Sequence, residues 1–310
     1  MEKRILMAVD DSIHSNQSLR YATQMFSGSK NVTFTLFHEQ PMISQYLVQE
    51  ARTDSKAYAS LKKVITKNTA EAQMLVEKQR KRMIKMGVPK KRIEMVAPQR
   101  MLGRSQDILE YARKGLYDAI VVGRRGLSRI QKTFMGSTSA ELLEKADAVP
   151  VWMVDGKVTS QRVLVAVDGS ESSYRALDHV GSMLFENAET TYCLFHVSQK
   201  AEHIDALSYA KDDLDIQAIV AKSTKRMMGE FFVAAEQKLK DVGISADRVD
   251  IITKPKRKTS VGKMILAEAD KGKFGTVVVG RRGADRAHYF GSVSRYVTQR
   301  ITDRALWLVP

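Results

Sequence analysis

Two glycine-containing segments hold the residues of this chain that could bind an anion. In the first, Gly123 and Gly126 are followed after nine residues by Gly136 and Ser137, at the start of a predicted helix. Glycine lets a backbone adopt positive φ and approach a phosphate closely, and the N–H groups at a helix start attract negative charge. The hydroxyls of Ser137 and Ser139 would add donors. This spacing predicts a phosphate-binding loop, with a ligand-free strand-to-helix turn as the alternative.

An aspartate follows the first predicted strand in each half of the chain, Asp10 in RILMAVD and Asp168 in RVLVAVD. Either carboxylate could accept a hydrogen bond from a ribose hydroxyl, or hold a Mg²⁺ ion brought in by nucleotide phosphates. A lone carboxylate provides only one of the several oxygen ligands that Mg²⁺ requires, so we expect a metal at Asp10 only together with a nucleotide.

The whole pattern occurs twice. Asp10 is matched by Asp168 at an offset of 158 residues, and Gly123 of DAIVVGRRG by Gly280 of GTVVVGRRG at an offset of 157. The closing runs VPVWMV and ALWLVP correspond as well. Offsets this constant indicate a duplicated unit of single-domain size. The predicted segments are a first domain over 1–155, a linker over 156–161 and a second domain over 162–310.

Short β-branched apolar runs alternate with helical stretches throughout both halves. Runs such as RILMAVD lack polar alternation, which is typical of strands that are buried on both faces. The alternation predicts an α/β fold with two tandem doubly wound parallel sheets. In such a sheet the ligand crevice lies at the carboxyl ends of the strands, where Asp10, Gly123 and their second-half counterparts are expected.

Four features appear in the same order in both halves: Val-Asp after the first strand, Phe-His ending the second, the glycine loop, and the terminal apolar strand. The Gly-two-Gly-nine-Gly-Ser arrangement resembles the nucleotide-binding signature of the universal stress protein family. The resemblance covers essentially the whole chain as two tandem domains. It implies a five-stranded, adenine nucleotide alpha hydrolase-like domain in each half, and one branch of that family binds ATP.

The resemblance also implies which first-half residues contact a nucleotide. Ala8, Val9 and Asp10 would line the adenine and ribose side, and Glu39 would lie near the adenine. The residues implied for the ribose and phosphates lie in and after the glycine loop: Val122, Gly123, Arg125, Gly126, Gly136, Ser137, Thr138 and Ser139.

The second half departs from this pattern, because seven residues rather than nine separate Gly283 from Gly291. A shorter loop crosses the same gap less freely, so we expect nucleotide at the first site in preference to the second. The second-half candidates by position are Asp168, Gly280, Gly283, Gly291, Ser292, Val293 and Ser294.

Other reactive side chains have a plainer interpretation beside a functional one. Arg124 and Arg281 could grip a phosphate or form part of a solvated surface pair with the next arginine. His38 and His196 end matched strands, and we expect packed, hydrogen-bonded rings rather than catalysis. Cys193 lies among apolar residues and is expected to be a buried, inert thiol.

The composition excludes several protein classes. One Cys in 310 residues cannot form an internal disulfide, and a zinc site with two thiolates is excluded as well. No secretory leader and no apolar run of about 18 residues is visible, so we expect a cytoplasmic protein without a membrane partner. The formal charge of +15 divides into +10 for residues 1–155 and +5 for the rest. Aromatic residues make up 7%, and no stacking platform for a nucleic acid is visible.

The sequence therefore predicts a tandem universal stress protein that binds ATP or a related adenine nucleotide and acts as a sensor or binding module. No general base is apparent, so at most slow hydrolysis is expected. The alternatives are a ligand-free interaction protein whose basic surface binds acidic partners, and a weak ATPase. The terminal runs VPVWMV and ALWLVP are expected to pair in an intramolecular pseudo-dimer, and assembly into a homo-oligomer stays open.

Overall fold

Each half of the chain builds a five-stranded parallel sheet in the computed structural model, which describes residues 2–124, 136–198, 214–281 and 291–310. The chain divides into two units, Met1–Asp155 and Gly156–Pro310. In the first unit the strand order is β3-β2-β1-β4-β5, and every neighbouring pair is parallel. The strands are β1 (Lys3–Ala8), β2 (Val32–Phe37), β3 (Ile93–Val96), β4 (Ala119–Gly123) and β5 (Val151–Val154).

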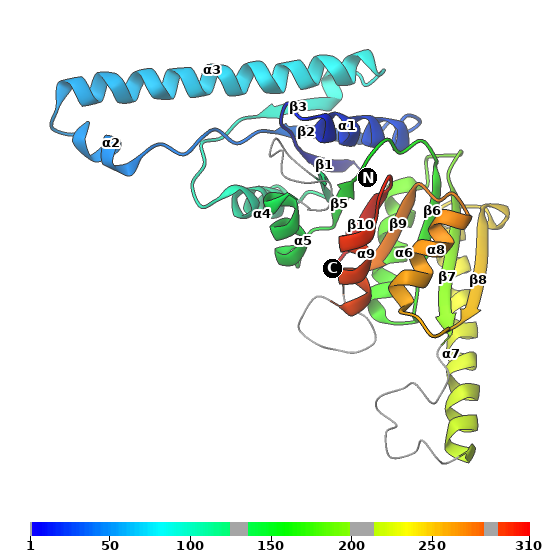
Figure 1. Ribbon diagram of the computed structural model, residues 1–310. Helices are drawn as coiled ribbons and strands as arrows, with labels where there is room; N and C mark the ends of the chain where they lie inside the picture. The colour runs from blue at the N-terminus through cyan, green and yellow to red at the C-terminus, as the bar shows by residue number, and fades with distance from the viewer. Residues whose placement is uncertain (1, 125–135, 199–213, 282–290) are drawn as a thin grey trace. The chain divides into compact units, whose positions relative to one another are not determined.

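Helices cover both faces of this first sheet (Figure 1). Helices α1 and α3 pack together on one face, and α4 and α5 pack together on the other. Right-handed crossovers require this division, because the chain reverses direction across the sheet after β3. The helices are α1 (Ile13–Met25), α2 (Gln45–Glu50), α3 (Ser55–Lys85), α4 (Arg104–Lys114) and α5 (Ser137–Lys145).

The second unit repeats the topology in the order β8-β7-β6-β9-β10, again with parallel pairs. The predicted doubly wound parallel sheet is thus confirmed in both halves. Its strands are β6 (Arg162–Ala166), β7 (Thr191–Ser198), β8 (Val249–Pro255), β9 (Thr276–Gly280) and β10 (Ala305–Val309). Its helices are α6 (Glu171–Leu184), α7 (Leu214–Asp241), α8 (Val261–Lys271) and α9 (Ser292–Arg300).

Helix α3 is longer than the sheet that it packs against. Its buried residues are confined to the last turns: Ala72, Val76, Gln79 and Met83. The preceding segment, 41–71, contains no buried residue and includes α2. The sheet therefore anchors α3 only through its carboxyl-terminal part, and α2 and the first turns of α3 extend past it (Figure 1).

Each sheet forms the centre of its own core. The centres of the middle strands are fully buried, as Ile5, Leu6 and Met7 of β1 show. Both tryptophans lie in the last strands, where Trp152 stacks on Phe26. Among the helices that the structure describes, none is both long enough and apolar enough to cross a membrane.

Candidate functional site

The chain turns sharply at the carboxyl end of β1, where Asp10 was predicted to face a ligand. β1 ends at Ala8, and the N–H of Val9 still donates to the carbonyl of Phe37 in β2, at 2.9 Å. Asp10 Oδ1 then accepts the N–H of Ser12 at 3.0 Å, which closes a turn of the Asx type. Among the described residues none donates to Asp10 Oδ2, so this oxygen can accept a hydrogen bond from a ligand.

Gly123 is the last residue of β4 and follows the buried Val122. We predicted positive φ at Gly123, and this prediction is wrong: the glycine has strand geometry and is absent from the positive-φ positions. Its lack of a side chain serves close packing instead. A Cβ there would lie 2.9 Å from the carbonyl carbon and from the Cβ of His14 in α1. Gly123 thus lets the start of α1 approach the end of β4.

The start of α5 is brought beside the same strand end. The N–H of Gly136 donates to the carbonyl of Arg124 at 2.8 Å, and the Ser139 hydroxyl donates to the carbonyl of Gly123 at 2.7 Å. Gly136 is the N-cap of α5, with φ of −60°, so Ser137 and Thr138 form its first turn. Because the first N–H groups of a helix lack intrahelical partners, this turn can bind an anion.

Arg124 does not match either sequence-based interpretation. Its side chain is buried and forms an ion pair with Asp155, with Nη1 and Oδ2 separated by 3.4 Å. It is therefore neither a solvated surface group nor a guanidinium presented to a phosphate. Arg125, Gly126 and Gly283 lie outside the described residues.

Glu39, predicted to lie near the adenine, forms a charged cluster at the carboxyl end of β2. Its side chain is 5% exposed, and Oε2 lies 2.5 Å from Arg100 Nε and 4.0 Å from Arg104 Nε. Glu39 Oε1 is buried without a hydrogen-bond partner. Burial raises the pKa of Glu39, and the adjacent Arg100 opposes that rise.

Asp107, in α4, completes this cluster. Its carboxylate accepts the N–H groups of Met101, Leu102 and Gly103 at 2.9 to 3.2 Å. Partial burial works to raise the pKa of Asp107, but these hydrogen bonds outweigh it and the pKa is lowered. Sequence reasoning missed Arg100, Arg104 and Asp107, because neither their spacing nor their types distinguish them from surface charges.

The two strand-end histidines are packed and hydrogen-bonded, as predicted. His38 Nδ1 lies 2.8 Å from the carbonyl of Val9, and His196 Nδ1 lies 2.9 Å from that of Val167. These equivalent contacts fasten the second strand of each half to the turn after the first. Burial raises the pKa of Cys193 to about 12, as expected for an inert thiol.

The second half repeats the backbone geometry of the site. Asp168 Oδ1 accepts both the Ser170 N–H, at 3.0 Å, and the Ser173 hydroxyl, at 2.8 Å. The Ser294 hydroxyl donates to the carbonyl of Gly280 at 2.6 Å. In the second half, the hydrogen bond from the Ser173 hydroxyl ties the turn at Asp168 to helix α6. No corresponding bond from Ser15 to the Asp10 carboxylate is present among the described residues.

The start of α9 lies beside the end of β9, as α5 lies beside β4. The N–H of Gly291 donates to the carbonyl of Arg281 at 3.0 Å, and Gly291 is the N-cap of α9. Ser292 and Val293 form the first turn of that helix. Despite the shorter connection in the sequence, the two ends of the glycine loop meet in the same way in both halves.

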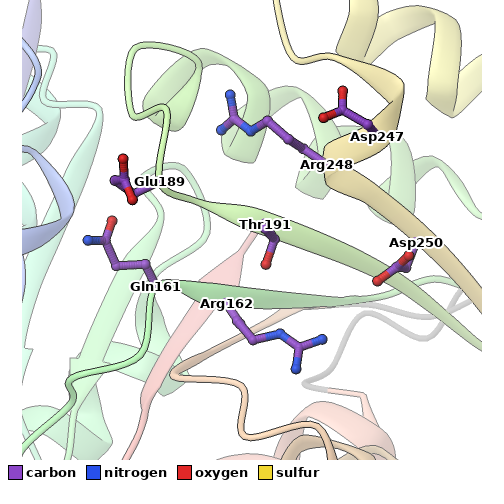
Figure 2. A pocket seen from close by; sticks show the side chains of 7 residues that line it. All are labelled: Gln161, Arg162, Glu189, Thr191, Asp247, Arg248 and Asp250. Atoms are coloured by element: carbon purple, nitrogen blue, oxygen red, sulfur yellow. The ribbon is translucent and has the colours of Figure 1, made fainter.

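A separate depression of about 390 Å³ lies in the second half, at the amino-terminal ends of the strands (Figure 2). Its two guanidinium groups hold the backbone together: Arg162 Nη1 donates to the carbonyl of Gly272, and Arg248 Nε to that of Thr190. Its other lining residues are Gln161, Glu189, Thr191, Asp247 and Asp250. Because parallel strands bring the candidate ligand-binding turns to their carboxyl ends, this depression is separate from the candidate site.

Known proteins resemble this chain in both sequence pattern and fold. The model of the universal stress protein family matches residues 1–155 and again 159–302. A universal stress protein from Archaeoglobus fulgidus is 19% identical, with a TM-score of 0.64 over 99% of this chain and 97% of that one. A functionally unknown protein from Pseudomonas aeruginosa is 12% identical, with a TM-score of 0.59 over 99% and 92%. Identities this low show the fold alone. Among curated proteins, none matches the chain.

Proposed function

The chain belongs to the universal stress protein family, as two tandem copies of its domain, and from this premise we propose that it binds ATP or a related adenine nucleotide. The site lies in the first half, between the turn after β1 and the start of α5. Binding there makes the protein a nucleotide-responsive module, with at most slow hydrolysis. The nucleotide-binding domains are 1–155 and 162–310, and the second half is the weaker site.

The carrying observation is the meeting of the β4 end with the start of α5. The hydrogen bond from Gly136 to Arg124 sets the first turn of α5 beside Gly123. Phosphates would be held there by N–H groups and the helix dipole, without a lysine of the Walker type. The Ser139 hydroxyl already donates to a backbone carbonyl. Its role in the site is therefore to hold the turn in place.

The polar atoms nearby suit a nucleoside. Asp10 Oδ2 is available to a ribose hydroxyl, whereas Oδ1 is occupied by Ser12. His14 Nδ1 is a buried atom without a hydrogen-bond partner. Buried polar atoms are seldom left unsatisfied, so donors from a ligand would remove a cost here. A Mg²⁺ ion would reach Asp10 only on the nucleotide phosphates.

Calorimetric titration of the full chain with ATP, ADP and AMP tests the proposal. We expect saturable heat with at least one nucleotide, and chromatography of the denatured protein would show any that co-purifies. Asp10→Asn should weaken binding more than Asp168→Asn, because the first-half site is the stronger. Absence of heat with all three nucleotides would refute the proposed function.

A further inference from the structure

The turn that carries Asp10 is hydrogen-bonded to the long helix α3, which lies far from it in the sequence. Gln79 of α3 is fully buried, and its Nε2 donates to the main-chain carbonyl of Asp10 at 2.7 Å. The two residues are 69 positions apart in the chain. A buried amide placed on a main-chain carbonyl is costly to remove, since the carbonyl is left without its donor.

Two cations of α3 extend this contact. Lys78 Nζ lies 2.8 Å from both carboxylate oxygens of Asp11, and its hydrogen bond lowers the pKa of Asp11. Arg82 Nη1 donates to Gln79 Oε1 at 2.9 Å and also to Asn16 of α1, and lies 3.6 Å from Asp11 Oδ1. Arg82 therefore fixes the orientation of the Gln79 amide, so that its NH₂ group faces Asp10.

In the second half the position of Gln79 is taken by a residue without an amide. Helices α3 and α7 end 156 residues apart, and each is followed by a glycine with φ near +95°, Gly87 and Gly243. This alignment places Ala235 opposite Gln79, and the family pattern places Gly169 opposite Asp11. A Cβ added at Gly169 would meet Met228 Sδ of α7 at 3.0 Å. Apolar packing thus replaces the polar contact.

We propose that Gln79 is a positioning residue of the first-half nucleotide site. It sets the main chain at Asp10, and with it the direction of the carboxylate that would accept the ribose hydroxyl; Lys78 and Arg82 hold the next residue. The inference rests on the proposed function. It gives the first site a supporting contact from outside the glycine loop, and it makes α3 the element through which that site can be influenced.

The test compares Gln79→Leu, which keeps the volume and removes the amide, with wild type and with Lys238→Ala. Lys238 matches Arg82 but pairs with Asp178, away from the first site. We expect the ATP dissociation constant to rise about five- to tenfold in Gln79→Leu, corresponding to one net hydrogen bond. It should rise less in Lys78→Ala, and stay unchanged in Lys238→Ala.

Amide hydrogen exchange without nucleotide supplies the second measurement. Gln79→Leu should speed exchange at the N–H groups of Ser12 and Ser15 while leaving the second half unchanged. Wild type that gives no heat with nucleotide refutes the proposed function. Wild type that binds ATP while Gln79→Leu binds it equally well refutes the positioning role. If exchange rises throughout the first half, the fold is disturbed and Lys78→Ala decides: unchanged affinity in that variant overturns the proposal.

Discussion

The two halves share a backbone and differ in what their long helices place against the first turn. In the first half α3 offers an amide and two cations to Asp10 and Asp11. In the second half α7 offers Met228 near Gly169, and Phe231 against Tyr174 of α6. The side-chain contacts to the main chain at the strand ends are common to both halves, whereas the side chains that the long helix adds differ.

The shared contacts are the ones that build the turn itself. A histidine near the carboxyl end of the second strand lies within hydrogen-bonding distance of the carbonyl after the first strand in both halves. A serine in the last helix bonds to the glycine ending the fourth strand in both halves as well. These bonds define a common scaffold, so differences in ligand binding should follow from the contacts that each half adds to it.

The largest expected effect concerns the buried pair of Arg124 and Asp155, a second polar contact of the first half. The second half has Pro310 at the place of Asp155, and the proline side chain carries no carboxylate. Asp155→Ala leaves a buried guanidinium without this partner, and we expect a loss of about 3 kcal/mol in the free energy of unfolding.

Urea denaturation of the Asp155→Ala variant measures this loss, in a Trp307→Phe background where Trp152 reports on the first half. Glu141→Ala is the control. It removes the exposed ion pair with Lys145, which should contribute under about 1 kcal/mol. A loss in Asp155→Ala no larger than that of the control would show that the buried pair adds nothing to the first half.

The second expected effect is a sensitivity of the second half to mild acid. Burial lowers the pKa of His179, whose ring packs edge-on against Trp307. The unfolded chain binds a proton at this histidine below about pH 6.5, whereas the folded chain does not. Stability is therefore lost as the pH falls, by up to about 2 kcal/mol between pH 6.5 and 5.

The first half has Tyr21 at the place of His179 and should lack this slope. Denaturation of a Trp152→Phe variant at pH 7 and 5, followed by Trp307 fluorescence, measures the second half. His179→Tyr should abolish the difference between the two pH values. An equal acid loss with histidine and with tyrosine would assign the slope to other groups.

The sequence predicted the features that local patterns encode. Apolar runs and their spacing were sufficient for the strands, the repeat and the placing of Asp10 and Gly123 at strand ends. They were not sufficient for the contact between Gln79 and Asp10, which joins residues 69 positions apart. A glutamine within a helix has the same pattern whether it faces solvent or a buried carbonyl.

Two expectations failed because one residue type serves two physical roles. Gly123 was predicted to provide positive φ, but it provides space for His14. Arg124 belongs to an Arg-Arg pair that resembles a surface or phosphate-binding motif, yet it is buried against Asp155. Neither role can be predicted without knowing which other segments of this chain pack against the residue. The nucleotide contacts of the site stay a prediction.

The smallest expected effect tests whether the long helices differ only where they touch the turn. Gly229 lies inside α7, and a Cβ there would meet nothing within 4 Å; the first half has Gln73 at this place. Gly229→Ala should raise the stability of the second half by about 0.5 to 1 kcal/mol, because alanine restricts the unfolded chain and favours helix.

Gly262→Ala is the contrasting variant in α8, where a Cβ would lie 2.8 Å from the Tyr296 ring and should destabilise. Urea denaturation followed at Trp307 measures both. If Gly229→Ala also changed ATP affinity at the first-half site, α7 would contribute to that site, and the division of roles between the two long helices would be wrong.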